Sequence, residues 1–112
     1  MGEQNPIEER FFKRYLSVTK AFPGRLSKLG QDLHATVLDV SRDGLGAILP
    51  MLLRKGDTVE LKFDDKRIVF QVAHCNEDLI HKGQYRCGLR RSGSTENLES
   101  IFRAGGYLNE ED

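Results

Sequence analysis

A chain of 112 residues has room for one compact domain. Its 17 Lys and Arg residues balance 17 Asp and Glu residues, and this zero net charge argues against a general binder of DNA or RNA. The sequence has no apolar run of about 18 residues and begins with an acidic, polar stretch unlike a signal peptide, which predicts a cytoplasmic protein without membrane insertion.

The elements expected along the chain are mostly short strands. They are predicted over residues 16–22 and 25–29, as one strand or a strand pair interrupted by Pro23-Gly24, and then over 33–40, 44–49, 58–63, 67–75 and 84–90. Alternation of apolar and polar residues, clearest in T-V-E-L-K-F at 58–63, is typical of strands with one buried face. Asp64-Asp65 predicts a turn, and a second hairpin is expected to turn near His81. Short strands at regular spacing indicate an antiparallel barrel or sandwich, and a small barrel is the prediction.

One helix is expected near the end of the chain. Ser94 is its predicted N-cap, apolar residues follow at helical spacing, and Gly105-Gly106 end it. We therefore expect a flexible N-terminal arm over residues 1–9, one domain over 10–104 and an acidic tail over 105–112.

The cysteines and histidines suggest no chemistry of their own. Two cysteines make no disulfide framework, and reduced thiols are the prediction. His74 and Cys75 are neighbours on a predicted strand, where adjacent side chains point to opposite faces, so they cannot form a catalytic pair. If the hairpin turns near His81, Cys75 and Cys87 lie opposite each other, and a redox pair becomes geometrically possible. Because metal-site spacings such as CxxC are missing from the sequence, we expect no metal, no cofactor and no enzyme.

Two short motifs are more informative together than apart. The first is RxxxR, formed by Arg10 and Arg14 in a segment with six basic residues and no acid between positions 10 and 28. The second is DxSxxG, formed by Asp39, Ser41 and Gly44. Each motif alone has an ordinary structural explanation, as one face of a basic arm or as a turn. Their combination ahead of this strand pattern points to a binding site.

With these motifs the sequence resembles the PilZ domain family, which are receptors for the bacterial second messenger cyclic di-GMP. In that family a basic RxxxR arm precedes a six-stranded barrel, and a strand ends in (D/N)xSxxG. The resemblance covers roughly residues 9–91 and includes L-D-V-S-R-D-G-L-G-A-I-L, K-G-D-T-V-E-L-K-F and Y-R-C-G-L-R. It implies a mainly β fold, a six-stranded antiparallel β-barrel with a C-terminal α-helix, as a PilZ domain over 10–104. It also implies cyclic di-GMP binding by Arg10, Arg14, Asp39, Ser41 and Gly44, all five of which are intact.

The residue types suit that ligand. Arginine forks can grip phosphates or the O6 and N7 acceptors of guanine through two parallel donors. Asp39 and Ser41 are two apart on a predicted strand, so their side chains are expected on one face, where the carboxylate can accept from guanine N1–H and its amine. The Ser41 hydroxyl can serve a guanine or a phosphate. Gly44 is expected to allow close backbone approach and a positive φ.

The predicted function is a cyclic di-GMP receptor or adaptor that changes conformation and signals to an unidentified effector protein. One alternative is a PilZ-like protein-interaction module that binds no nucleotide, and another is a small single-stranded nucleic-acid-binding barrel. Glu9 stands before Arg10, where family members that take up two stacked ligands often carry a basic residue. We therefore expect one ligand per chain, because a carboxylate there repels clustered phosphates.

Overall fold

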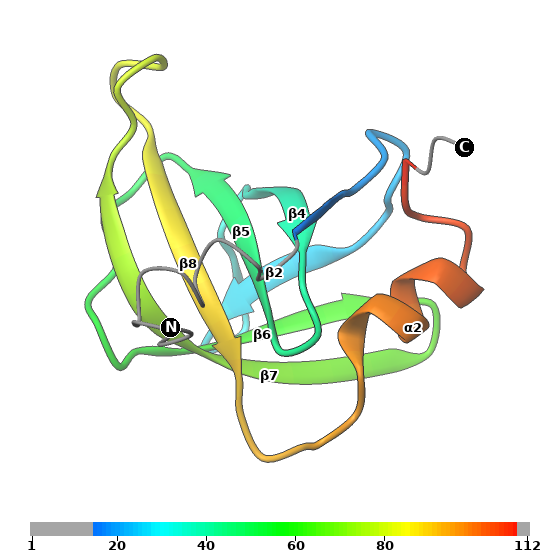
Figure 1. Cartoon of the computed structure of the whole chain (residues 1–112). Coiled ribbons are helices and arrows are strands. Elements are labelled where there is room, and N and C mark those ends of the chain that lie inside the picture. The colour runs from blue at the N-terminus through cyan, green and yellow to red at the C-terminus, as the bar shows by residue number, and fades with distance from the viewer. Residues whose placement is uncertain (1–14, 110–112) are drawn as a thin grey trace, which may run out of the picture.

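The computed structural model describes residues 15–109, and their strands form one curled antiparallel sheet (Figure 1). The strand order is β1-β4-β5-β8-β7-β6-β2-β3. The elements are β1 (Leu16–Ser17), β2 (Arg25–Lys28), β3 (Gln31–Asp32), β4 (Thr36–Val40), β5 (Gly44–Leu49), β6 (Thr58–Phe63), β7 (Lys66–Glu77), β8 (Tyr85–Arg91) and α2 (Leu98–Ala104).

The prediction of a mainly β domain with one C-terminal helix is confirmed. The sheet has eight strands among the described residues rather than six. The difference lies in β1 and β3, each two residues long at an end of the strand order, whereas the other six strands have four residues or more. The sheet curls into a half-barrel, and its inner face and α2 enclose the core (Figure 1).

Strand alternation places the core as the sequence predicts. On β6 the buried side chains are Val59, Leu61 and Phe63, and the residues between them face outward. β7 pairs with β6 through the predicted hairpin, whose turn residue Asp64 has a positive φ of 55°. Each fully buried aliphatic or phenyl side chain stabilises the fold by about 1.5–3 kcal/mol.

Three predicted strands are shorter in the structure. Of residues 16–22 only Leu16 and Ser17 form a strand, followed by an isolated bridge between Val18 and Leu108. Residues 33–35 lie outside β4, because His34 has a φ of 53° and donates its N–H to Asp32 Oδ1 at 2.8 Å. β2 ends at Lys28, and positive φ values at the next two residues turn the chain into β3.

The two cysteines are joined in a disulfide, so the prediction of reduced thiols is wrong. The β7–β8 hairpin turns around His81 as expected and brings Cys75 directly opposite Cys87. A shift of register between Val72 and His74 reverses the inward and outward positions of β7 beyond that point. The shift turns Cys75 toward the inner face with Cys87, while His74 is exposed.

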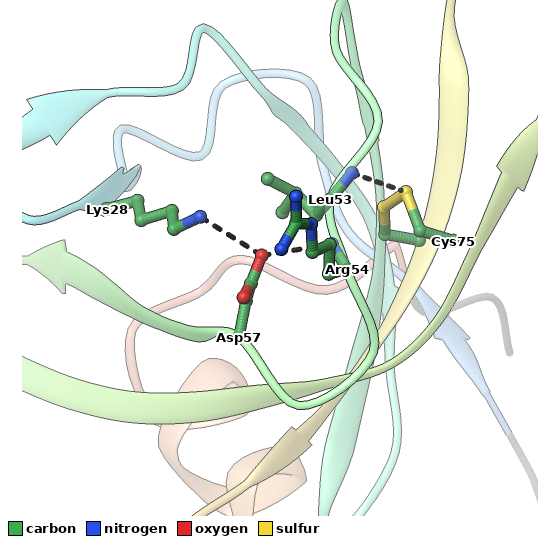
Figure 2. A network of polar contacts seen from close by, with 6 residues as sticks. Lys28, Leu53, Arg54, Asp57 and Cys75 are labelled. Atoms are coloured by element: carbon green, nitrogen blue, oxygen red, sulfur yellow. Dashed lines mark hydrogen bonds and ion pairs between the residues drawn. A yellow bond between two sulfur atoms is a disulfide. The ribbon is translucent and has the colours of Figure 1, made fainter.

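The loop between β5 and β6 is tied down at two points (Figure 2). The Asp57 carboxylate accepts from the Arg54 backbone N–H at 2.9 Å and from Lys28 Nζ on β2 at 3.0 Å. The Leu53 N–H points at Cys75 Sγ, 3.4 Å away. The disulfide therefore contacts a third segment of chain besides the two strands that it joins.

The helix α2 begins later than predicted. Its N-cap is Asn97, whose Oδ1 accepts from the Ser100 N–H at 3.3 Å, whereas Ser94 Oγ accepts from the Glu96 N–H in the preceding turn. The predicted N-cap at Ser94 is therefore wrong, because its hydroxyl is used one turn earlier. The helix ends at Gly105, as predicted.

An aromatic cluster fixes α2 on the sheet. Leu98 and Phe102 are fully buried, and the Phe102 ring lies 4.9 Å from Phe22 and 5.3 Å from Phe63 between centroids. Such ring pairs add about 0.5–1.5 kcal/mol each beyond their buried area. Leu98 and Phe102 thus anchor one face of the helix in the core. Among residues 15–109 no helix is long and apolar enough to cross a membrane.

The segment that follows the helix packs on the domain. Leu108 is buried, the Tyr107 hydroxyl donates to Asp64 at 2.9 Å, and the Asn109 N–H donates to the Ser17 carbonyl at 2.9 Å. Residues 105–109, which the sequence assigned to an acidic tail, are therefore held against β1 and the β6–β7 turn.

Candidate functional site

The DxSxxG motif forms the end of β4, a tight turn and the start of β5. β4 ends at Val40, and the Ser41 N–H donates to the Gly44 carbonyl at 2.8 Å. Ser41 is only 1% exposed, and its Oγ lies 3.4 Å from both Asp43 Oδ1 and the Gly44 carbonyl. Asp39 and Ser41 therefore do not share an outer face as predicted, because the chain leaves the strand between them.

Gly44 is required by the packing of two strands. A methyl group placed there would lie 2.6 Å from the backbone oxygen of Leu89 on β8, well inside van der Waals contact. Gly44 is not among the glycines with positive φ, so that part of the prediction is wrong. Its role in this structure is to let β5 and β8 approach closely.

A second feature of the motif turn is its link to α2. The Arg42 carbonyl accepts from the Leu98 N–H at 2.9 Å and from the Arg91 guanidinium at 2.9 Å. The same guanidinium donates to the Glu96 carbonyl, and the Arg91 N–H donates to the Asp43 carbonyl at 2.8 Å. The turn is thus hydrogen-bonded to the end of β8 and to the first residue of α2.

The outward face of β4, β5, β8 and β7 carries a row of residues in register. Asp39 pairs with Gly46, Gly46 with Gly88, and Gly88 with His74. The two end side chains lean over the glycines, since a methyl group at Gly46 would lie 2.6 Å from Asp39 Oδ1 and one at Gly88 would collide with the His74 ring. The row therefore exposes the backbone of Gly46 and Gly88 between the Asp39 carboxylate and the His74 imidazole. We call these two residues the glycine floor.

A cleft of about 540 Å³ lies over this floor, within the roughly 300–1,000 Å³ of typical small-molecule sites. The predicted site residues Asp39 and Gly44 line it, together with Asp43 and Tyr15, whereas buried Ser41 supports the turn from below. Residues that sequence reasoning missed also line it: Gly46, His74, Arg86, Gly88 and Arg90. The alternation in Y-R-C-G-L-R could have found three of them, since inward Cys87 and Leu89 require the intervening residues to face outward.

Burial and one arginine set the electrostatics of Asp39. Burial raises the pKa of Asp39 above its ordinary 3.8, while Arg86 and the Gly46 N–H oppose the rise. Arg86 Nη2 lies 3.8 Å from Asp39 Oδ2, and the Asp39 side chain is 24% exposed. The cleft therefore presents a half-buried acceptor beside a half-exposed cation.

The two arginines of RxxxR, Arg10 and Arg14, lie outside the described residues, as does Glu9. Tyr15 directly follows Arg14 in the sequence and lines the cleft. In the sequence, the RxxxR motif therefore ends one residue before a residue that lines the cleft. Among residues 15–109 no group of three His, Cys, Asp or Glu side chains could hold a metal ion.

These features define a small antiparallel β-sheet domain with a cleft on its outer face that carries charged side chains. The family model of the PilZ domain matches residues 8–104, which is nearly the whole chain. The chain therefore belongs to the PilZ domain family, whose domains are binding and adaptor modules rather than enzymes. No curated protein and no solved structure matches the chain.

Proposed function

We propose that this protein is a cyclic di-GMP receptor that changes conformation on binding and signals, in the cytoplasm, to a partner effector protein. The observation that supports the proposal is one cleft lined by residues of DxSxxG and by the residue that follows RxxxR in the sequence. Asp39 and Gly44 of DxSxxG line it, and so does Tyr15, the residue after RxxxR. The volume, the glycine floor and the mixture of two cations with two carboxylates fit a ligand that has both phosphates and guanine edges.

Four of the five motif residues have a chemical or positioning role in this proposal. The forks of Arg10 and Arg14 hold phosphate or guanine acceptors through paired donors. Asp39 accepts from guanine N1–H and the exocyclic amine, in its ionised form. Ser41 acts as a positioning residue, because its hydroxyl lies inside the turn against Asp43 and Gly44 rather than at the cleft.

Calorimetric titration of the purified chain with cyclic di-GMP, GTP and a single-stranded oligonucleotide tests this function. We expect saturable binding of cyclic di-GMP alone. In Arg10→Ala and in Arg14→Ala the affinity should fall at least tenfold, since a charge-assisted hydrogen bond contributes about 1.5–3 kcal/mol. Arg25→Ala is a matched control, because this arginine pairs with Asp32 at 2.7 Å and does not line the cleft.

The titration also separates the two alternatives. A chain that binds none of the three probes is a protein-interaction module, and the receptor function fails. Preferential binding of the oligonucleotide, weakening with added salt, would instead indicate a single-stranded nucleic-acid binder.

A further inference from the structure

Asp39 and Arg86 form an ion pair across two strand spacings. Asp39 lies on β4 and Arg86 on β8, with β5 between them. The Nη2–Oδ2 distance of 3.8 Å is longer than a hydrogen bond, so the pair is held close without committing its donors and acceptors to each other. Both side chains line the cleft.

Gly46 is what makes this pair possible. It stands opposite Asp39 on β5, while the β5 partner of Arg86 is Ile48, one outward position further along. A methyl group at Gly46 would lie 2.6 Å from Asp39 Oδ1, in the space that the carboxylate occupies above β5. The missing side chain lets the carboxylate lie across the middle strand and meet the guanidinium from the far side.

The side-by-side acceptor and donor match two adjacent edges of guanine. The Watson–Crick edge presents the N2 amine and N1–H as donors, and the neighbouring Hoogsteen edge presents O6 and N7 as acceptors. A carboxylate accepts from the first two, and an arginine fork donates to the second two. Adenine has an amine donor where guanine has O6, so it would turn that donor toward the guanidinium.

We propose that Arg86 is a specificity-determining residue, which selects guanine over adenine by donating to O6 and N7 while Asp39 reads the adjacent donors. This inference rests on the proposed function. Its physical basis is the position of the two side chains beside each other over Gly46, which places an acceptor and a donor together in the cleft. Arg86 is 54% exposed in the pair and so is accessible to a ligand in the cleft.

Three cyclic dinucleotides separate the contribution of Arg86 to base recognition from that of Asp39. Cyclic di-IMP keeps O6 and N7 but lacks the N2 amine, and cyclic di-AMP reverses the O6 position. Arg86→Ala should lower the affinities for cyclic di-GMP and cyclic di-IMP by the same factor, about tenfold or more, and change the affinity for cyclic di-AMP far less. Asp39→Asn should instead reduce the preference for cyclic di-GMP over cyclic di-IMP.

Arg90→Ala is the matched control, because Arg90 lies on the same strand and face and also lines the cleft. Losing this cation should weaken all three dinucleotides alike. Arg86→Lys keeps the charge without the fork and should recover only part of the guanine preference. Thermal unfolding of each variant verifies that it is folded.

Two results would overturn the inference alone. The first is that Arg86→Ala binds cyclic di-GMP as tightly as the parent does. The second is that Arg86→Ala loses affinity equally for all three dinucleotides, which would mean that Arg86 acts only as a charge. If the parent chain binds no cyclic di-GMP, the proposed function fails and the inference fails with it.

Discussion

Gly44→Ala should destabilise the fold, although a glycine in a turn motif is easily taken for a ligand contact. The added methyl group would lie 2.6 Å from the Leu89 backbone oxygen, whereas ordinary van der Waals contacts begin at 3.4 Å. The neighbour is main chain in the β5–β8 pair, so it cannot rotate away like the end of a side chain. The two strands must separate locally, at the edge of the cleft.

The expected size follows from two opposing effects. Overpacking of this kind costs about 1–3 kcal/mol. Replacing glycine where φ is negative recovers about 0.4–1 kcal/mol, because the unfolded chain loses freedom. A net loss of about 1–2 kcal/mol should lower Tm by about 4–8 °C per kcal/mol.

Urea and thermal unfolding of the purified variant measure this loss. Gly46→Ala is the matched control, since its methyl group would meet only the Asp39 carboxylate, which can swing aside. We expect Gly46→Ala to keep most of the stability and to weaken cyclic di-GMP binding by displacing Asp39. The packing argument would be refuted if Gly44→Ala were as stable as the parent. It would also be refuted if only the control, Gly46→Ala, lost stability.

The remaining predictions concern the disulfide, Asp39 and the arm. Reduction of the disulfide, or the double change Cys75→Ser with Cys87→Ser, should lower the free energy of unfolding by about 2–3 kcal/mol, because the bond closes a loop of sequence separation 12. Equal urea midpoints with and without reductant would contradict this prediction. Asp39→Asn should stabilise the fold at about pH 7, because burial raises the pKa of Asp39 and the ionised carboxylate is therefore the form that destabilises the folded state. This gain in stability should shrink as the pH falls through the raised pKa toward 3.8. A gain that stays constant down to about pH 4 would argue against this explanation. Calorimetry should give one cyclic di-GMP per chain, with Glu9→Arg raising the affinity or moving the ratio toward two, and a ratio of two for the parent would count against the charge argument.

The sequence predicts the β elements well where alternation and turn residues act locally. The β6–β7 hairpin follows from the alternating T-V-E-L-K-F and the Asp64-Asp65 turn. The sequence predicts the strands poorly where a single residue interrupts the regular alternation of inward and outward side chains. The register shift between Val72 and His74, which brings Cys75 to the inner face, depends on pairing with β8 and has no composition signal.

The candidate site divides in the same way. Asp39 and Gly44 were found by motif, and both line the cleft. The buried hydroxyl of Ser41 could not be foreseen, because alternation assumes that the strand continues where it in fact turns. Arg86 was missed because its contact with Asp39 spans three strands, and such a relation exists only once the strand order is known.

The Arg42 carbonyl, which accepts from both Leu98 and Arg91, gives the domain a mechanical property. A displacement of the motif turn would stretch hydrogen bonds to both the end of β8 and the first residue of α2, because one oxygen atom accepts from both. Leu98 is fully buried, so we expect α2 to move with the turn or to lose its first contact with the core. Phe102, one helical turn further along Leu98–Ala104, would convey that motion to the Phe22 and Phe63 rings. The outer face of the sheet and the packing of its interior are thereby coupled through the carbonyl of a single residue.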